Sequence, residues 1–234
     1  MPPPIDDPVE ADRLSRRSTL VRAGGLAAVA VGAACLPAEA AGTTRQDGAV
    51  TCVLSPEMTE GPYYLANEKM RRNITEGLPG APLSLHLTVA DASTCKPIKG
   101  AAVDIWHASA GGKYSGEQAN DTVGQTFLRG IQRTDANGLA LFATVYPGWY
   151  PGRTVHIHVK VHIGGNVVHT GQLFFRDGFT DVVYRRAPYS GRPARDVRNT
   201  DDSIYLGGGS RSLLRMRSAG KGYVGSITMG VRRR

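Results

Sequence analysis

Thirteen residues near the middle of the chain, Tyr146 to His158 (YPGWYPGRTVHIH), place the strongest constraint on its fold. From residue 154 to residue 161, apolar side chains alternate with polar ones. Successive side chains of a β-strand point to opposite faces, so His156 and His158 share one face and the apolar residues share the other. Two Pro-Gly pairs directly before this run favour a tight loop instead of regular structure. The segment therefore predicts a strand that presents two imidazoles side by side.

Two imidazoles on one strand face indicate a metal site, because neutral imidazole is a common ligand of iron, copper and zinc. The preceding loop is short enough to return Tyr150 and Arg153 toward the same strand. On this spacing alone, a polar strand face without any ligand is an equally open interpretation. A copper or zinc site on His156, His158 and His162, which have the same parity along the strand, is a further alternative.

The rest of the chain after residue 52 is typical of strands and turns. Residues 83–89, 101–106 and 139–145 alternate between apolar and polar side chains, and residues 135–138 (DANG) predict a hairpin turn before the last of them. No segment sustains an amphipathic helical period. We therefore expect an all-β fold, an antiparallel β-sandwich with a single domain.

The first 40 residues are typical of a targeting segment. Arg16 and Arg17 precede an apolar, Ala- and Gly-rich run over residues 23–36, and residues 38–40 (AEA) form a small-x-small cleavage site. The pattern resembles a bacterial twin-arginine signal, which implies export of a folded protein to the periplasm or the medium. We expect residues 1–40 to be removed, leaving residues 41–234 as a β-sandwich core with a basic C-terminal tail and no stable membrane insertion. A Sec signal, a retained anchor and lipidation of Cys35 are the alternatives.

The three cysteines agree with export. Cys35 leaves with the signal segment, and Cys52 and Cys95 remain as an even pair in an oxidising compartment, where a disulfide is expected. Two buried free thiols are the alternative.

The formal net charge of +8 is compatible with an anionic partner. No nucleic-acid-binding motif accompanies that charge, and the three arginines that end the chain are typical of a solvated tail. We expect no nucleic-acid partner.

Six segments occur in an order and spacing that resemble the intradiol ring-cleavage dioxygenases, the family of protocatechuate 3,4-dioxygenase and catechol 1,2-dioxygenase. They are TEGPYY (59–64), GAAVDIWH (100–107), GKYS (112–115), TDANG (134–138), PGWY (147–150) and RTVHIH (153–158). The resemblance implies a β-sandwich that holds one non-haem Fe(III) through two tyrosinates and two histidines. It also implies an enzyme that uses O2 to cleave a small aromatic diol between its two hydroxyl-bearing carbons, giving a cis,cis-muconate-type diacid.

The resemblance assigns four residues to the iron. Tyr114 matches the tyrosinate that stays on the metal throughout turnover, and Tyr150 matches the tyrosinate that the substrate displaces. His156 and His158 match the two imidazole ligands. Without the resemblance, both tyrosines are also compatible with packing at the edge of a sandwich.

Two further residues match the family's active site. Arg153 matches an arginine suited to stabilising a carbanionic ring, and Gln172 resembles a glutamine that lines the site. The loop between Tyr150 and His156 holds only five residues, fewer than in the well-known enzymes, so the substrate does not follow from the resemblance. We also expect no helical N-terminal segment of the kind with which catechol 1,2-dioxygenases dimerise. A non-catalytic, exported, transthyretin-like binding module remains the alternative from another class.

Overall fold

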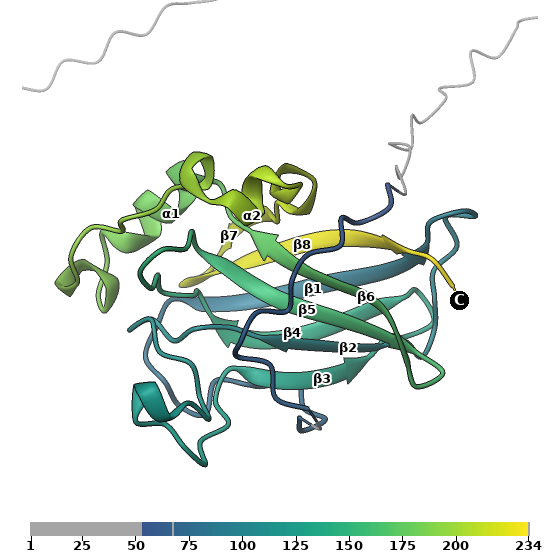
Figure 1. The fold of residues 1–234 in the computed structure, drawn as a ribbon, viewed down its shortest axis with the longest axis horizontal. Coiled ribbons are helices and arrows are strands. Elements are labelled where there is room, and N and C mark those ends of the chain that lie inside the picture. Colours follow the sequence, from purple (N-terminus) through teal and green to yellow (C-terminus); the bar gives the residue numbers. More distant parts are fainter. Residues whose placement is uncertain (1–52, 67, 234) are drawn as a thin grey trace, which may run out of the picture. The chain divides into compact units, whose positions relative to one another are not determined.

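The computed structural model describes residues 53–66 and 68–233. Eight strands form two four-stranded sheets, which lie face to face (Figure 1). The first sheet has the order β4-β1-β8-β7 and the second has the order β3-β2-β5-β6. The strands are β1 (Pro82–Asp91), β2 (Ala102–Trp106), β3 (Arg129–Arg133), β4 (Leu139–Val145), β5 (His156–Ile163), β6 (Asn166–Phe174), β7 (Arg215–Ala219) and β8 (Gly222–Val231). The predicted all-β sandwich is confirmed.

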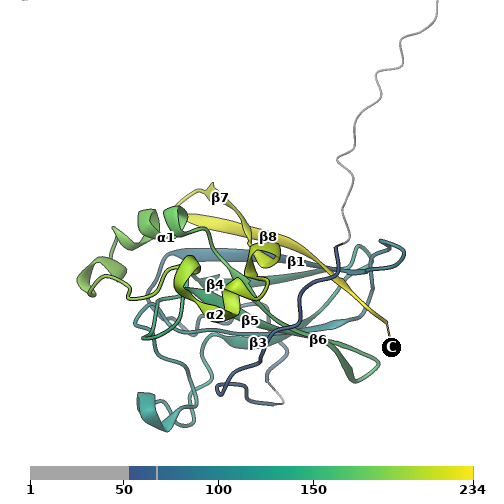
Figure 2. The same cartoon turned by 45° about the horizontal axis from the view of Figure 1, so that its top comes forward.

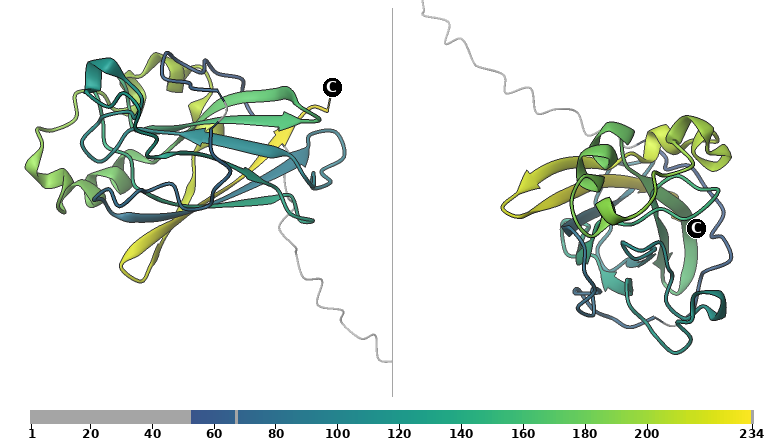
Figure 3. Two further views of the ribbon diagram at one scale, coloured as in Figure 1. Left: turned by 90° about the horizontal axis from the view of Figure 1, so that it is seen from below. Right: turned by 90° about the vertical axis from the view of Figure 1, so that its left-hand side faces the viewer.

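Antiparallel pairing dominates both sheets, but β1 and β8 run parallel. These two strands are far apart in sequence, so no hairpin dictates their relative direction, and a parallel pair requires a long connection. The β7–β8 hairpin extends beyond the rest of its sheet (Figure 3).

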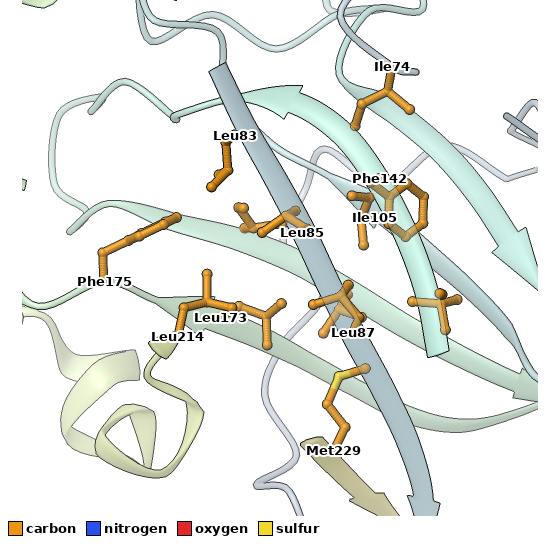
Figure 4. Close-up of a cluster of buried hydrophobic side chains, with 14 of the residues drawn as sticks. Ile74, Leu83, Leu85, Leu87, Ile105, Phe142, Leu173, Phe175, Leu214 and Met229 are labelled. Carbon is orange, nitrogen blue, oxygen red and sulfur yellow. The ribbon is translucent and has the colours of Figure 1, made fainter. Parts of the chain in front are cut away.

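The core lies between the sheets. Strand β1 supplies Leu83, Leu85 and Leu87 at every second position, and each is at most 2% exposed. They pack with residues from the other strands, among them Ile105, Phe142, Leu173 and Met229, and with Phe175 directly after β6 (Figure 4). The alternation read from residues 83–89 is thus the alternation between the core and the outer face of the first sheet.

The turn at residues 135–138 has the predicted turn structure but does not form a hairpin. Asp135 accepts hydrogen bonds from the backbone N–H groups of Asn137 and Leu139, and Gly138 adopts a positive φ of 73°. The chain then crosses from β3 in one sheet to β4 in the other, where β4 pairs with β1. The prediction was wrong here because local turn chemistry does not determine which strand the next strand pairs with.

Two short helices, which the sequence did not predict, follow β6. Helix α1 spans Asp177–Tyr184 and α2 spans Ser203–Leu206, and both lie at one end of the sandwich (Figure 2). The 3-10 turns are η1 (Gln118–Asn120), η2 (Tyr189–Gly191), η3 (Asn199–Asp201) and η4 (Gly209–Ser212). The described part of the chain contains no helix long and apolar enough to cross a bilayer.

Residues 53–66 form an extended segment, here called the strap, which passes across β5 and β6 (Figure 1). Its Ser55 N–H donates to Gly230 O at one end, and its Met58 N–H donates to Thr170 O of β6. The signal segment, Cys35 and Cys52 lie outside the described residues, so export and the bridge between Cys52 and Cys95 stay predictions.

Candidate metal centre

Strand β5 places His156 and His158 on the outer face of the β3-β2-β5-β6 sheet, as predicted. Alternate residues of the same strand, such as Ile157, belong to the core cluster. Both histidines are nonetheless buried, at 3% and 1% exposed. The adjacent strands place Trp106 and Gln172 directly opposite His158.

The two imidazoles face each other through their Nε2 atoms, which lie 3.1 Å apart. His156 Nδ1 lies 2.6 Å from the carbonyl oxygen of Thr154, which can only accept a hydrogen bond, so Nδ1 carries the proton and Nε2 has a free lone pair. Burial, with the charge of Arg153 in addition, lowers the pKa of His156 to about 3. Burial followed by the proximity of His156 lowers the pKa of His158 well below its usual value. Both rings are therefore neutral near pH 7, the state in which imidazole binds metals.

Two tyrosines complete the group from loops outside the strands. Tyr150, in the loop before β5, places its hydroxyl 3.2 Å from His156 Nε2. Tyr114, in the loop after β2, is 1% exposed, and its ring centroid lies 5.5 Å from that of Tyr150 and 6.0 Å from that of His158. Burial is the main cause that raises the pKa of both phenols. Without a bound cation, both phenols are therefore protonated at neutral pH.

Arg153 and Gln172 lie next to these four residues and contact each other. An Arg153 Nη2 hydrogen donates to Gln172 Oε1 over 2.6 Å, and Gln172 Nε2 donates to Thr59 O in the strap. The Arg153 Nε–H donates to Asp202 Oδ2 over 2.8 Å. All six residues predicted as site residues are thus brought together.

The donor set fits a hard trivalent cation. Tyr114 Oη and His158 Nδ1 are buried without hydrogen-bond partners among the described residues, although buried polar atoms are normally paired. The described residues contain no group of three or more His, Cys, Asp or Glu suited to a metal. A metal here would therefore need the phenol oxygens. Phenolate oxygens with two imidazoles suit Fe(III) better than a site built on histidine alone.

The alternative zinc or copper site with His162 finds no support. His162 lies four residues beyond His158, which corresponds to roughly 13 Å along a strand. A register shift between Val161 and His162 further disturbs the parity that the alternative assumed.

The strap covers the site, and its role was not recognised in the sequence beyond the TEGPYY segment. The ring of Tyr63 stacks on that of Tyr114 with centroids 4.3 Å apart, and Tyr64 packs against Trp106. A Cβ atom on Gly61, which has a φ of +71°, would lie 3.3 Å from His158 Cε1. The strap backbone therefore lies directly against His158, a predicted metal ligand. This contact joins two segments that are distant in sequence, so the sequence alone could not show it.

A second polar cluster lies under the strap beside the site. Asp104 is fully buried opposite Lys160, and neither carboxyl oxygen has a hydrogen-bond partner in the described part of the chain. Lys160 Nζ pairs with Glu60 of the strap and lies 3.5 Å from the ring centroid of Tyr64. Burial first, and the charge of Glu68 second, raise the pKa of Asp104 to about 7.

Comparison with known proteins connects this geometry to one group. A family model described as "Dioxygenase" matches residues 56–179. A solved structure of an intradiol ring-cleavage dioxygenase from Tetranychus urticae is 37% identical, covers 77% of this chain and 95% of that chain, and superposes with a TM-score of 0.73. The dioxygenase domain of a dioxygenase carbohydrate-binding protein fusion from Streptomyces sp. SirexAA-E is 32% identical over 78% of this chain and 100% of that chain, with a TM-score of 0.61.

Curated relatives point the same way over a shorter span. Catechol 1,2-dioxygenase 1 of Acinetobacter lwoffii is 32% identical over 41% of this chain and 32% of its own length. A chlorocatechol 1,2-dioxygenase of Cupriavidus pinatubonensis is 28% identical over 51% of this chain and 54% of its own length. The matched part thus spans about a third to a half of these curated relatives.

Proposed function

The chain belongs to the intradiol ring-cleavage dioxygenase family, and we propose that it uses O2 to open a catechol-type ring between its two hydroxyl-bearing carbons, giving a cis,cis-muconate-type diacid. The observation that carries the proposal is the meeting of Tyr114, Tyr150, His156 and His158 in one buried group, with two buried polar atoms left unpaired. Packing residues of a non-catalytic module have no reason to gather four such donors.

These four side chains would hold the metal. When bound, Fe(III) would withdraw electron density from a catecholate and so make the ring reactive toward O2. The two phenols would bind as phenolates, since a nearby trivalent cation reverses the effect of burial on their pKa. The neutral imidazoles need no such change, because burial already disfavours their charged forms.

Tyr150 is the residue we assign to proton transfer. Like Tyr114 it comes from a loop, but it is partly buried where Tyr114 is fully buried. In that role the Tyr150 phenolate oxygen would accept the second proton of the catechol as the substrate binds.

Arg153 and Gln172 act on the substrate through charge and hydrogen bonds in this proposal. The guanidinium is held by Gln172 and Asp202, so its position is defined before substrate arrives. A fixed positive charge stabilises negative charge that develops on the ring, and it needs no reorganisation at the moment of reaction.

The proposal is tested with iron-loaded protein and a panel of catechol, protocatechuate, hydroxyquinol and chlorocatechols. We expect oxygen uptake with at least one of them and a muconate-type product identified by mass and absorbance. The His158→Ala variant is the matched control. A reddish colour from tyrosinate-to-iron charge transfer is also expected. A colourless protein that contains iron and consumes no oxygen would instead support a binding module, and bound zinc or copper would contradict the iron assignment.

We also propose that residues 1–40 direct export through the twin-arginine route, with loss of the segment afterwards. Changing Arg16 and Arg17 to Lys should trap the precursor in the cytoplasm, and undiminished export would favour a Sec signal. The proposed bridge between Cys52 and Cys95 predicts no free thiol in the unfolded, non-reduced mature protein.

A further inference from the structure

We infer that Asp202 is the positioning residue that fixes the guanidinium of Arg153 for ring cleavage; this inference rests on the proposed function. Asp202 lies directly after η3 and is only 2% exposed. Its Oδ2 accepts hydrogen bonds from Arg153 Nε at 2.8 Å and from Thr154 N at 2.9 Å. The same carboxylate therefore holds both the side chain of Arg153 and the backbone that follows it.

The second oxygen of Asp202 is used as well. Oδ1 accepts from the backbone N–H groups of Ile204 and Tyr205, at 2.9 and 2.8 Å, and so caps the N-terminus of α2. Burial alone would raise the pKa of Asp202, but the hydrogen bond from Arg153 and those from Tyr205 N and Thr154 N outweigh burial and lower it. The carboxylate is thus ionised, and its four donors set its orientation.

This anchor defines the plane of the Arg153 guanidinium. Nε is bound to Asp202 and Nη2 is bound to Gln172, which lies opposite His158 on the neighbouring strand. Two contacts at different nitrogens of one planar group leave it little rotational freedom.

The turn that carries Asp202 is itself attached to the site. Asn199 Oδ1 accepts from Thr154 Oγ1 over 2.7 Å, and Asn199 Nδ2 donates to Phe175 O over 2.8 Å. Asn199 and Asp202 therefore hold Arg153 and Thr154, which precede β5. The carbonyl oxygen of Thr154 in turn accepts a hydrogen bond from Nδ1 of His156, a proposed iron ligand.

The family model covers Arg153 but not its anchor. The matched region ends at residue 179, whereas Asp202 lies beyond it in the segment between β6 and β7. The role of Asp202 is therefore read from the contacts of this chain alone.

The test compares Asp202→Ser with Asp201→Ser in the iron-loaded protein. Serine is a good N-cap, so Asp202→Ser can retain the start of α2 while losing the charge and the oxygen that holds Arg153. We expect kcat/KM for the catechol cleaved by the parent to fall about ten- to a hundredfold, because small misplacement of a positioning group has effects of that order. Asp201 is exposed, and its variant should remain within about twofold of the parent. Iron content should be the same in all three proteins. If Asp202→Ser does not fold, the isosteric Asp202→Asn replaces it.

A double-mutant cycle with Arg153→Gln separates positioning from a general structural role. If Asp202 acts through Arg153, adding Asp202→Ser to Arg153→Gln should change kcat/KM by less than about twofold, because the group to be positioned is already gone. A full, independent loss in the double variant would overturn the inference, and so would an unchanged rate in Asp202→Ser alone. A parent protein that cleaves no catechol would instead refute the proposed function. The unfolding free energies of the parent, Asp202→Ser, Arg153→Gln and the double variant would then show whether Asp202 and Arg153 are coupled. Absence of coupling would overturn the inference that Asp202 holds Arg153 in place.

Discussion

The two faces of the β3-β2-β5-β6 sheet are buried to a similar degree but for different reasons. On the inner face, Val103, Ile105 and Ile157 are fully buried against the opposite sheet. On the outer face, Asp104, Trp106, His156 and His158 are also at most 3% exposed. Loops and the strap, not a second sheet, cover this face.

The comparison shows that burial alone does not identify a core. The inner face gains stability from removing apolar area from water, which is non-directional and tolerant of similar shapes. The outer face buries polar groups, which is favourable only where each has a partner. The imidazoles and phenols have partial pairing among themselves, and Asp104 has none in the described part of the chain. Under the proposed function, the inner face serves stability and the outer face serves chemistry.

The largest effects on iron binding and on stability are expected from substitutions of His158 and Ile157, which are adjacent residues on opposite faces of β5. His158→Ala should remove iron and reduce oxygen uptake to that of the iron-free parent, because no nearby side chain replaces its lone pair. In the apo-protein this change removes the unpaired Nδ1 together with the ring, which offsets part of the stability lost with the packing of the ring on Trp106.

Ile157→Ala is the matched change on the inner face. It should lower the unfolding free energy by about 2–5 kcal/mol through lost burial and the remaining cavity, while the folded fraction still binds iron. Metal content and urea unfolding of both variants make the comparison. Loss of iron in Ile157→Ala with little loss of stability would contradict the division between the faces.

Tyr150→Phe should have the next largest effect. Its ring still packs in the cluster with Tyr114 and Trp106, but the oxygen that accepts the substrate proton is gone. We expect iron to remain bound with a shifted visible band, and kcat to fall by a factor of roughly a hundred to ten thousand. Cleavage at the parent rate with an unchanged spectrum would show that Tyr150 is not a ligand.

Asp104→Asn tests the buried carboxyl of the outer face. Because the folded-state pKa of Asp104 is about 7 and the unfolded value is about 4, the unfolded chain releases this proton first as the pH rises. The contribution of Asp104 to the unfolding free energy of the parent should therefore be largest at or below about pH 4, fall as the pH rises toward 7, and change no further above it. The contribution is up to about 4 kcal/mol.

The asparagine variant should lack that part of the slope. It should match the parent near pH 4 and be more stable at pH 8, as measured by urea unfolding at both values. Asp201→Asn, at an exposed position, is the control. Parallel profiles of Asp104→Asn and the parent would show that Asp104 is ionised at a normal pKa.

The sequence was sufficient for the parts that repeat locally. Alternation located β1, β2, β4 and β5 to within a few residues, and it placed His156 and His158 on one face. The order and spacing of the family motifs indicated Tyr114 and Tyr150 as site residues, and the fold places both tyrosines next to the histidines. These features depend on neighbouring residues or on a family pattern.

The remaining features depend on contacts between distant segments. Nothing near Asp202 indicates Arg153, 49 residues away, although an aspartate before SIYL is a recognisable N-cap signal. The parallel pairing of β1 with β8 and the crossing of the chain from β3 to β4 likewise depend on which strands meet in space. Sequence spacing carries no such information.

The smallest effect is expected at the end of the strap. Glu57 is 65% exposed; its carboxylate lies 2.9 Å from His169 Nδ1 and accepts a hydrogen bond from Thr170 N at 3.0 Å. Contacts of such an exposed carboxylate typically contribute between zero and about 1 kcal/mol. The strap is also held by the backbone hydrogen bond from Met58 to Thr170 and by Gln172 Nε2 donating to Thr59 O.

Glu57→Gln should therefore lower the unfolding free energy by less than about 1 kcal/mol and leave kcat within about twofold of the parent. Thr59 contributes its backbone carbonyl, so Thr59→Ala is a control that retains the second contact. A tenfold loss of kcat in Glu57→Gln alone would show that the strap depends on this exposed carboxylate, and that the cover of the outer face is held from its edge.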